Sequence, residues 1–239
     1  MKYRKLGKKG PQVSSLGQGC MVLTESYGAT DPNAAENLIK KAYENGITFY
    51  DTADVYGQGV NEELLGKAVH AFRNKVVIAS KCGIQINPLD FAHTINNHPD
   101  YIKKCCESSL KRLKMETIDL YYLHRFNPEV PIEKSMEAML HLIQEGKIRY
   151  VGLSEVESDI LERAHVVLGD KLVAVQNEFS IANHAVTEKV LPACRKLGVS
   201  LVAYCPLGRG LLSGAIKDPH AFKESSEFDF RSILPLSKS

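Results

Sequence analysis

The sequence predicts an α/β fold whose core is a parallel β-sheet covered by helices. The first observation is a set of short runs rich in apolar and β-branched residues, at 47–50, 75–80, 118–123, 149–153, 171–175 and 200–204. These runs are almost continuously apolar and do not alternate with polar residues, which is typical of strands buried on both faces. The second observation is that helix-like stretches separate the runs through short connectors. This alternation of strand and helix predicts parallel pairing.

Six helices are expected between the strands, at 33–45, 62–72, 101–113, 131–144, 158–168 and 187–197. In the first of them the apolar residues recur at close to the 3.6-residue period of a helix, at Ala35, Leu38, Ile39, Ala42 and Tyr43. Glycine follows several of the helices, where a helix C-terminus favours it. Because no linker or low-complexity segment interrupts this pattern, the sequence predicts a single domain over residues 1–239.

A seventh strand is expected at 15–20, ahead of the first helix, and the segments 3–6 and 12–14 flank a turn and predict a β-hairpin. This count favours a TIM (β/α)8-type barrel that is incomplete, with about seven of the eight parallel strands. An open doubly wound sheet is the alternative, and a Gly-x-Gly-x-x-Gly fingerprint after the first strand would favour it. Here Gly17 and Gly19 are followed by no third glycine, so the barrel is preferred.

The composition is that of an ordinary soluble globular protein. Of the 239 residues, 44% are hydrophobic and 24% are charged, as in ordinary soluble proteins. The net charge of +2 is too small to indicate binding to nucleic acid or to a membrane, and no apolar run is long enough to span a bilayer. The N-terminus lacks the apolar stretch of a signal peptide. The six cysteines form no Cys-x-x-Cys pair, so no metal site is expected, and reduced thiols in the cytoplasm are the simplest interpretation.

Three ionisable side chains stand at the ends of successive strands: Asp51, Lys81 and His124. The carboxyl ends of barrel strands surround the active-site mouth, so we expect these side chains to meet there. Tyr56 follows Asp51 by a loop long enough to bring its phenol over the same mouth. Taken singly, each residue is more often structural, and an aspartate after a strand is a common turn former. Four such residues in this order favour a catalytic site.

These four groups suit the reduction of a carbonyl, which needs a hydride donor on carbon and a proton donor on oxygen. A free tyrosine has a pKa of about 10 and donates a proton poorly at neutral pH. A nearby lysine ammonium should lower the pKa of Tyr56, and Asp51 should keep a buried Lys81 charged. His124 can hydrogen-bond the substrate oxygen and orient it.

Longer motifs around these residues resemble those of the aldo-keto reductases. The segment 46–57 (GITFYDTADVYG), continued by 61–66 (NEELLG), is similar to the first signature of that family, and 109–113 (SLKRL) with 119–124 (DLYYLH) is similar to the second. The segments 145–149 (EGKIR), 152–154 (GLS) and 203–210 (AYCPLGRG) are also family-like. The similarity runs from about residue 3 to residue 235 and leans toward the bacterial, plant and fungal oxidoreductase-like branch.

The resemblance implies a carbonyl reductase that uses NADPH and takes a small aldehyde or ketone. Tyr56 would be the proton donor, Lys81 and Asp51 its tuning pair, and His124 the orienting group. Ser154 and Gln176 would hydrogen-bond the nicotinamide carboxamide, and Tyr204 would stack on the ring. One loop would wrap the pyrophosphate, with Arg209 aimed at it: Cys205, Pro206, Leu207, Gly208, Arg209 and Gly210. Glu155 stands where many members carry asparagine, and Cys205 where serine is usual.

The resemblance also sets an expectation for the end of the chain. The family continues after the seventh strand with another helix, an eighth strand and a basic residue for the cofactor 2′-phosphate, whereas here 228–235 (FDFRSILP) is still family-like and 236–239 follow. We therefore expect a truncated barrel with an open edge that favours self-association or a complementing chain, and weak discrimination between NADPH and NADH. Two functions stay open: an NADPH-dependent carbonyl reductase, and a catalytically impaired remnant or non-catalytic nicotinamide-binding module.

Overall fold

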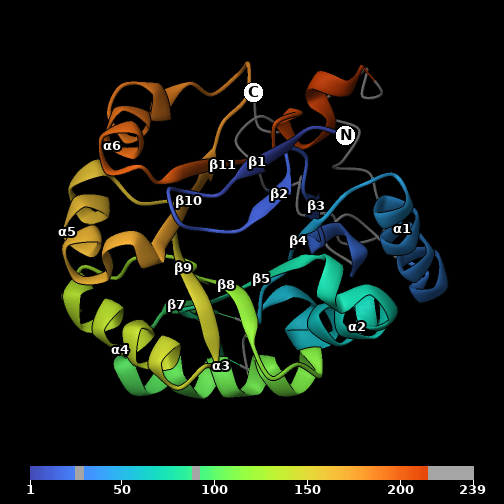
Figure 1. Cartoon of the computed structure of the whole chain (residues 1–239), viewed down its shortest axis with the longest axis horizontal. Helices are drawn as coiled ribbons and strands as arrows, with labels where there is room; N and C mark the ends of the chain where they lie inside the picture. The colour runs from blue at the N-terminus through green and yellow to red at the C-terminus, as the bar shows by residue number, and fades with distance from the viewer. Residues whose placement is uncertain (25–29, 88–91, 215–239) are drawn as a thin grey trace.

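A computed structural model describes residues 1–24, 30–87 and 92–214. Its central feature is a parallel sheet with the strand order β11-β10-β9-β8-β5-β4-β3. The strands are β3 (Gln18–Gly19), β4 (Phe49–Asp51), β5 (Val77–Cys82), β8 (Ile118–Leu123), β9 (Ile148–Ser154), β10 (Leu172–Glu178) and β11 (Ser200–Tyr204). The sheet curls into an incomplete barrel, and the helices form an arc around its outer face (Figure 1). This confirms the predicted fold class over the open doubly wound alternative.

All six predicted helices are present, with ends that differ from the expected ones by less than one turn. They are α1 (Pro32–Glu44), α2 (Val60–Val69), α3 (Pro99–Leu113), α4 (Ile132–Gln144), α5 (Ser158–Leu168) and α6 (Val190–Leu197). Helix α1 begins earlier than expected because the Asp31 carboxylate accepts hydrogen bonds from the backbone N–H groups of Asn33 and Ala34. Helix α2 ends before Phe72, whose φ of −131° is not helical, and a 3₁₀ segment takes over at His70–Lys75.

In the part of the chain that the structure describes, two β-hairpins accompany the main sheet. The predicted one pairs β1 (Tyr3–Lys5) with β2 (Gln12–Ser14), and a second pairs β6 (Ile84–Ile86) with β7 (His93–Ile95) and was not foreseen from the sequence. The leading strand, expected over 15–20, is reduced to the two residues of β3. It stops there because Cys20 already leads into a 3₁₀ turn at Met21–Leu23.

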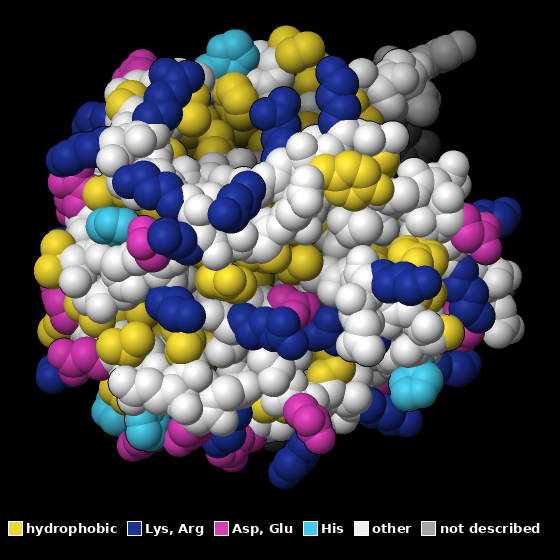
Figure 2. Space-filling model, viewed as in Figure 1, with side chains coloured by type: hydrophobic (Ala, Val, Ile, Leu, Met, Phe, Trp, Pro, Cys, Tyr) yellow, Lys and Arg dark blue, Asp and Glu magenta, His cyan; other side chains and the backbone are white. Residues whose placement is uncertain are grey.

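The β1–β2 hairpin covers the amino ends of the strands. The backbone N–H of Gly7 donates to the Ser200 hydroxyl at the start of β11, and the N–H of Ser14 donates to the Thr48 hydroxyl just before β4. The hairpin lies in front of the strands in Figure 1, and the same face in Figure 2 shows lysine and arginine side chains gathered around it. The opposite end, formed by the carboxyl ends of the strands, is therefore the one left for the candidate site.

Two hydrophobic layers hold the sheet, as the near-continuous apolar strands predicted. The larger layer lies between sheet and helices and includes Ile78, Tyr121 and Val151, all without exposed surface. The smaller layer lies inside the curl of the sheet, where Leu120 and Tyr122 of β8 pack with residues such as Leu6 of the N-terminal hairpin. Each large apolar side chain buried in this way contributes about 1.5 to 3 kcal/mol, so both layers support the strand ends that carry the site.

Within the described ranges, no helix has both the length and the apolar character needed to cross a membrane. No group of three or more histidine, cysteine or acidic side chains in these ranges could hold a metal ion. The family-like segment 228–235 lies outside the described residues.

Candidate active site

Four polar side chains meet at the carboxyl ends of three neighbouring strands. Asp51 is the last residue of β4, Lys81 lies near the end of β5, and His124 directly follows β8. These strands are adjacent in the order β8-β5-β4, so their ends are side by side. Tyr56 begins a 3₁₀ turn at Tyr56–Gly59, which returns its side chain to the same place. The structure thus brings together the four residues expected to converge.

Lys81 is the centre of this group. Its Nζ forms an ion pair with the Asp51 carboxylate and donates to the Thr52 carbonyl at 2.7 Å. It also donates to the Tyr56 hydroxyl at 3.3 Å. The Tyr56 and His124 rings meet edge to face, with their centroids 6.0 Å apart. One ammonium therefore links the carboxylate to the phenol, with the imidazole beside them.

The pKa of Lys81 is set by burial and by its partners. Only 1% of its side chain is exposed, and this burial lowers the pKa of Lys81. The charges and hydrogen bonds of Asp51 and Tyr56 raise it by more, so the net pKa of Lys81 lies above its ordinary value. The ammonium therefore stays charged, as expected from its aspartate neighbour.

The pKa of Tyr56 moves opposite to the sequence-based expectation. Burial raises the pKa of the phenol, and this exceeds the lowering by the Lys81 charge, while Asp51 raises it further. The expected net lowering by Lys81 was wrong because it left out desolvation, which disfavours the phenolate. Tyr56 consequently keeps its proton at neutral pH and can donate it.

His124 is a buried, neutral imidazole. Burial lowers its pKa well below the ordinary histidine value, and the charges of Lys81 and Arg125 lower it further. Its Nδ1 is buried, and no described residue provides a hydrogen-bond partner for it. A neutral ring beside two cations can hydrogen-bond a substrate oxygen without adding a third charge.

Three predicted cofactor contacts lie on the neighbouring strands. Ser154 ends β9 and pairs in register with Gln176 of β10, and Tyr204 ends β11 opposite Glu178. The Gln176 amide nitrogen donates to the second Asp51 oxygen at 2.9 Å, which ties these strands to the four-residue cluster. Tyr204 keeps part of its surface exposed.

The loop that follows Tyr204 differs from expectation at Arg209. Its guanidinium forms a bidentate ion pair with the Glu178 carboxylate, at 3.2 and 3.1 Å. The side chain is thus directed at Glu178 of β10, whereas from the sequence we expected it to be directed at the pyrophosphate. Sequence reasoning missed this because Glu178 is remote along the chain and comes close only through β10–β11 pairing. Gly208 and Gly210 have left-handed φ values of 56° and 101°, which suit a tight loop whose backbone comes close to a ligand. Cys205, Pro206 and Leu207 form the first part of this loop.

The described residues fit a nicotinamide. A carboxamide needs both a donor and an acceptor, which Ser154 and Gln176 offer from paired positions, and a flat ring needs a face such as that of Tyr204. The buried Nδ1 of His124, at the same end, has no hydrogen-bond partner among the described residues and is consistent with a site that takes up a polar ligand.

Buried polar pairs support the cluster from behind. The Thr52 hydroxyl donates to Asn61 at 2.7 Å, and the Ser80 hydroxyl donates to Glu62. Glu62, whose side chain has no exposed surface, forms an ion pair with Arg112 at 2.6 Å. Asn61 and Glu62 lie in the family-like segment 61–66, but their partners Thr52, Ser80 and Arg112 could not be predicted from the sequence.

Arg125 is a further residue that the sequence reasoning did not single out. Its Nη1 donates to the His124 carbonyl at 2.7 Å and to the Ser154 hydroxyl at 3.2 Å. The only sequence indication is its place directly after the strand-end histidine.

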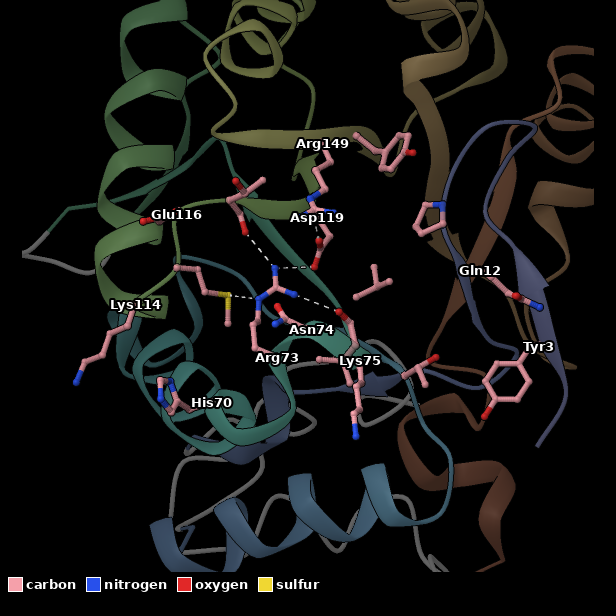
Figure 3. A pocket seen from close by; sticks show the side chains of 17 residues that line it. Tyr3, Gln12, His70, Arg73, Asn74, Lys75, Lys114, Glu116, Asp119 and Arg149 are labelled. Atoms are coloured by element: carbon pink, nitrogen blue, oxygen red, sulfur yellow. Dashed lines mark hydrogen bonds and ion pairs between the residues drawn. The ribbon is translucent and has the colours of Figure 1, made fainter.

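A separate cavity of about 940 Å³ lies at the other end of the barrel, beside the N-terminal hairpin (Figure 3). Its inner charged groups are occupied structurally, because Arg73 pairs with Asp119 at 2.8 Å and also donates to two backbone carbonyls. None of the four clustered residues lines this cavity, so we do not assign the active site to it.

Comparisons with known proteins agree with this geometry. The model of the Aldo/keto reductase family matches residues 15–233. A curated relative, the probable aldo-keto reductase 1 of Glycine max, is 45% identical over 214 residues, which cover 88% of this chain and 60% of that protein. The chain thus spans about 60% of the length of this relative.

Solved structures of related enzymes have the same fold. The aldo-keto reductase AKR11C1 from Bacillus halodurans, in its holo form, is 35% identical with a TM-score of 0.81, over 89% of this chain and 68% of that one. The glycerol dehydrogenase AKR11B4 from Gluconobacter oxydans is 29% identical with a TM-score of 0.83, over 98% of this chain and 71% of that one.

Proposed function

The chain belongs to the aldo/keto reductase family, and we propose that it reduces small aldehydes and ketones to alcohols with NADPH. The observation that carries this proposal is the contact of one buried ammonium, Lys81, with both the Asp51 carboxylate and the Tyr56 hydroxyl, beside a neutral His124. When bound, NADPH would supply the hydride for the carbonyl carbon.

Tyr56 would donate its proton to the carbonyl oxygen. Its raised pKa keeps it protonated at neutral pH, and the Lys81 ammonium would stabilise the phenolate that remains. Asp51 keeps Lys81 charged in a buried position. The neutral imidazole of His124 would hydrogen-bond the carbonyl oxygen and hold it within reach of Tyr56.

Ser154, Gln176 and Tyr204 would hold the nicotinamide, and the loop of residues 205–210 would surround the pyrophosphate. Since Gln176 also bonds to Asp51, cofactor placement and the proton-donor group are linked through one carboxylate. The choice of NADPH as the cofactor rests on the family resemblance.

The test compares two tyrosine-to-phenylalanine variants of the purified chain. Tyr56→Phe should lower kcat by about 10² to 10⁴-fold, the usual contribution of general acid catalysis, while NADPH binding measured by calorimetry stays close to wild type. Tyr150→Phe is the matched control, because its hydroxyl bonds to the Lys9 carbonyl of the N-terminal hairpin. Unchanged turnover in Tyr56→Phe would refute the proton donor. NADPH binding by the wild type without turnover of any aldehyde would favour a non-catalytic nicotinamide-binding module.

A further inference from the structure

Arg125 is a charged group beside the cluster for which the proposed mechanism has no use. We propose that Arg125 binds an anionic group of the substrate, so that the site prefers aldehydes and ketones that carry a carboxylate or a phosphate. This inference rests on the proposed reductase function and adds a substrate class to it.

The position of Arg125 places its charge at the mouth of the site. It directly follows His124, and its Nη1 bridges the His124 carbonyl and the Ser154 hydroxyl. Its charge also acts on both tyrosines of the site, since it lowers the pKa of Tyr56 and of Tyr204 against the raising effect of their burial. Arg125 therefore lies between the proton-donor group and the residues expected to hold the nicotinamide.

Among the described residues, Arg125 has no carboxylate partner of the kind that the other partly buried arginines have. Arg73, Arg112 and Arg209 each form an ion pair with an aspartate or glutamate. No acidic side chain in the described ranges forms one with Arg125, although it is itself partly buried and its charge, like that of Lys81, acts on the His124 ring. Partial burial of a cation without an anionic partner carries a desolvation cost, which a bound anion would offset.

The guanidinium of Arg125 has donors that no described residue uses. Both hydrogen bonds that Arg125 makes within residues 1–24, 30–87 and 92–214 come from Nη1. Nε and Nη2 therefore keep their N–H groups for another acceptor, and these two nitrogens form the fork that matches the two oxygens of a carboxylate or phosphate. A purely positioning arginine would need Nη1 alone.

The experiment measures how strongly the purified chain prefers a charged substrate over its neutral counterpart. The pairs are 4-carboxybenzaldehyde with methyl 4-formylbenzoate, and glyceraldehyde 3-phosphate with glyceraldehyde, each reduced with NADPH. A charged hydrogen bond corresponds to a preference of about 10- to 100-fold in kcat/KM. We expect wild type to show this preference for at least one pair, and Arg125→Met to lose it. The pair that shows it separates carboxylate from phosphate recognition.

Two further variants make the result specific. Arg195→Met removes an exposed arginine of α6 and should leave the preference at its wild-type value. Arg125→Lys keeps the charge but loses the fork, so it should give an intermediate preference. It replaces Arg125→Met as the test if that variant does not fold. Equal kcat/KM for charged and neutral members in wild type, or the same ratio in wild type and the Arg125 variants, would overturn the inference.

A binding measurement separates this inference from the proposed function. Calorimetric titration with benzoate and with inorganic phosphate needs no turnover. If wild type reduces no aldehyde but binds one of these anions about 10-fold or more tightly than Arg125→Met, the reductase proposal fails while the anion site stands. If wild type reduces the neutral aldehydes but shows neither a charge preference nor Arg125-dependent anion binding, the anion site fails while the reductase proposal stands.

Discussion

The ion pair between Glu62 and Arg112 should dominate the stability of the region behind the candidate site. The Glu62 side chain has no exposed surface, and its two oxygens accept from Arg112, at 2.6 Å, and from Ser80. The Arg112 side chain is 25% exposed. Arg112→Met keeps most of the aliphatic stem but leaves the Glu62 carboxylate buried without its cation. Such a change costs about 3 to 5 kcal/mol, a large part of the 5 to 15 kcal/mol that holds a typical domain together.

Urea unfolding of wild type, Arg112→Met, Glu62→Gln and the double variant measures this coupling. The double variant should lose less free energy of unfolding than the two single variants lose together, because it leaves no buried charge behind. The matched control is Arg163→Met, which breaks a pair with Glu133 whose two contacts, 2.8 Å each, are almost as short but lie on the exposed faces of α4 and α5. That control should change the free energy of unfolding far less. If Arg112→Met stays within about 1 kcal/mol of wild type, the buried pair does not carry the stability inferred for it.

Two variants and one titration test the remaining electrostatics and packing. In wild type the raised pKa of Lys81 gives stability that is present below its ordinary pKa and lost only as the pH rises through the raised value. Asp51→Asn removes the main cause of that rise, so burial should bring the pKa of Lys81 below its ordinary value. The free energy of unfolding of this variant should then increase as the pH rises from about 7 to 10. A pH profile of stability parallel to that of wild type would contradict this. His124 should remain neutral at pH 6.5 in an NMR titration, where an unperturbed histidine is half protonated, and a midpoint near 6.5 would show that burial does not control it. Gly152→Ala should cost about 1 to 3 kcal/mol by thermal or urea unfolding, because its Cβ would lie 2.3 Å from the buried Tyr122 ring; an unchanged stability would mean that the ring can move aside.

The sequence by itself determined the order of strands and helices and the convergence of the four polar residues. Both follow from local rules. Continuous apolar runs with helical stretches between them require a parallel sheet, and residues at the carboxyl ends of adjacent parallel strands must lie together. Asp51, Lys81 and His124 are close for this reason alone. The hairpin β6–β7 was missed because its short strands are largely exposed and carry no apolar run.

Only the tertiary structure decided the electrostatics of the site. The pKa of Tyr56 rises because desolvation exceeds the effect of Lys81, and desolvation depends on everything packed around the phenol. Arg209 turns to Glu178 on the neighbouring strand β10, and no carboxylate among the described residues pairs with Arg125, whose Nη1 donates to the His124 carbonyl and the Ser154 hydroxyl. A sequence specifies which charged side chains a protein carries. Whether each of them is buried or paired depends on distances between residues that are far apart in the sequence, and the pattern of residues along the chain does not give those distances.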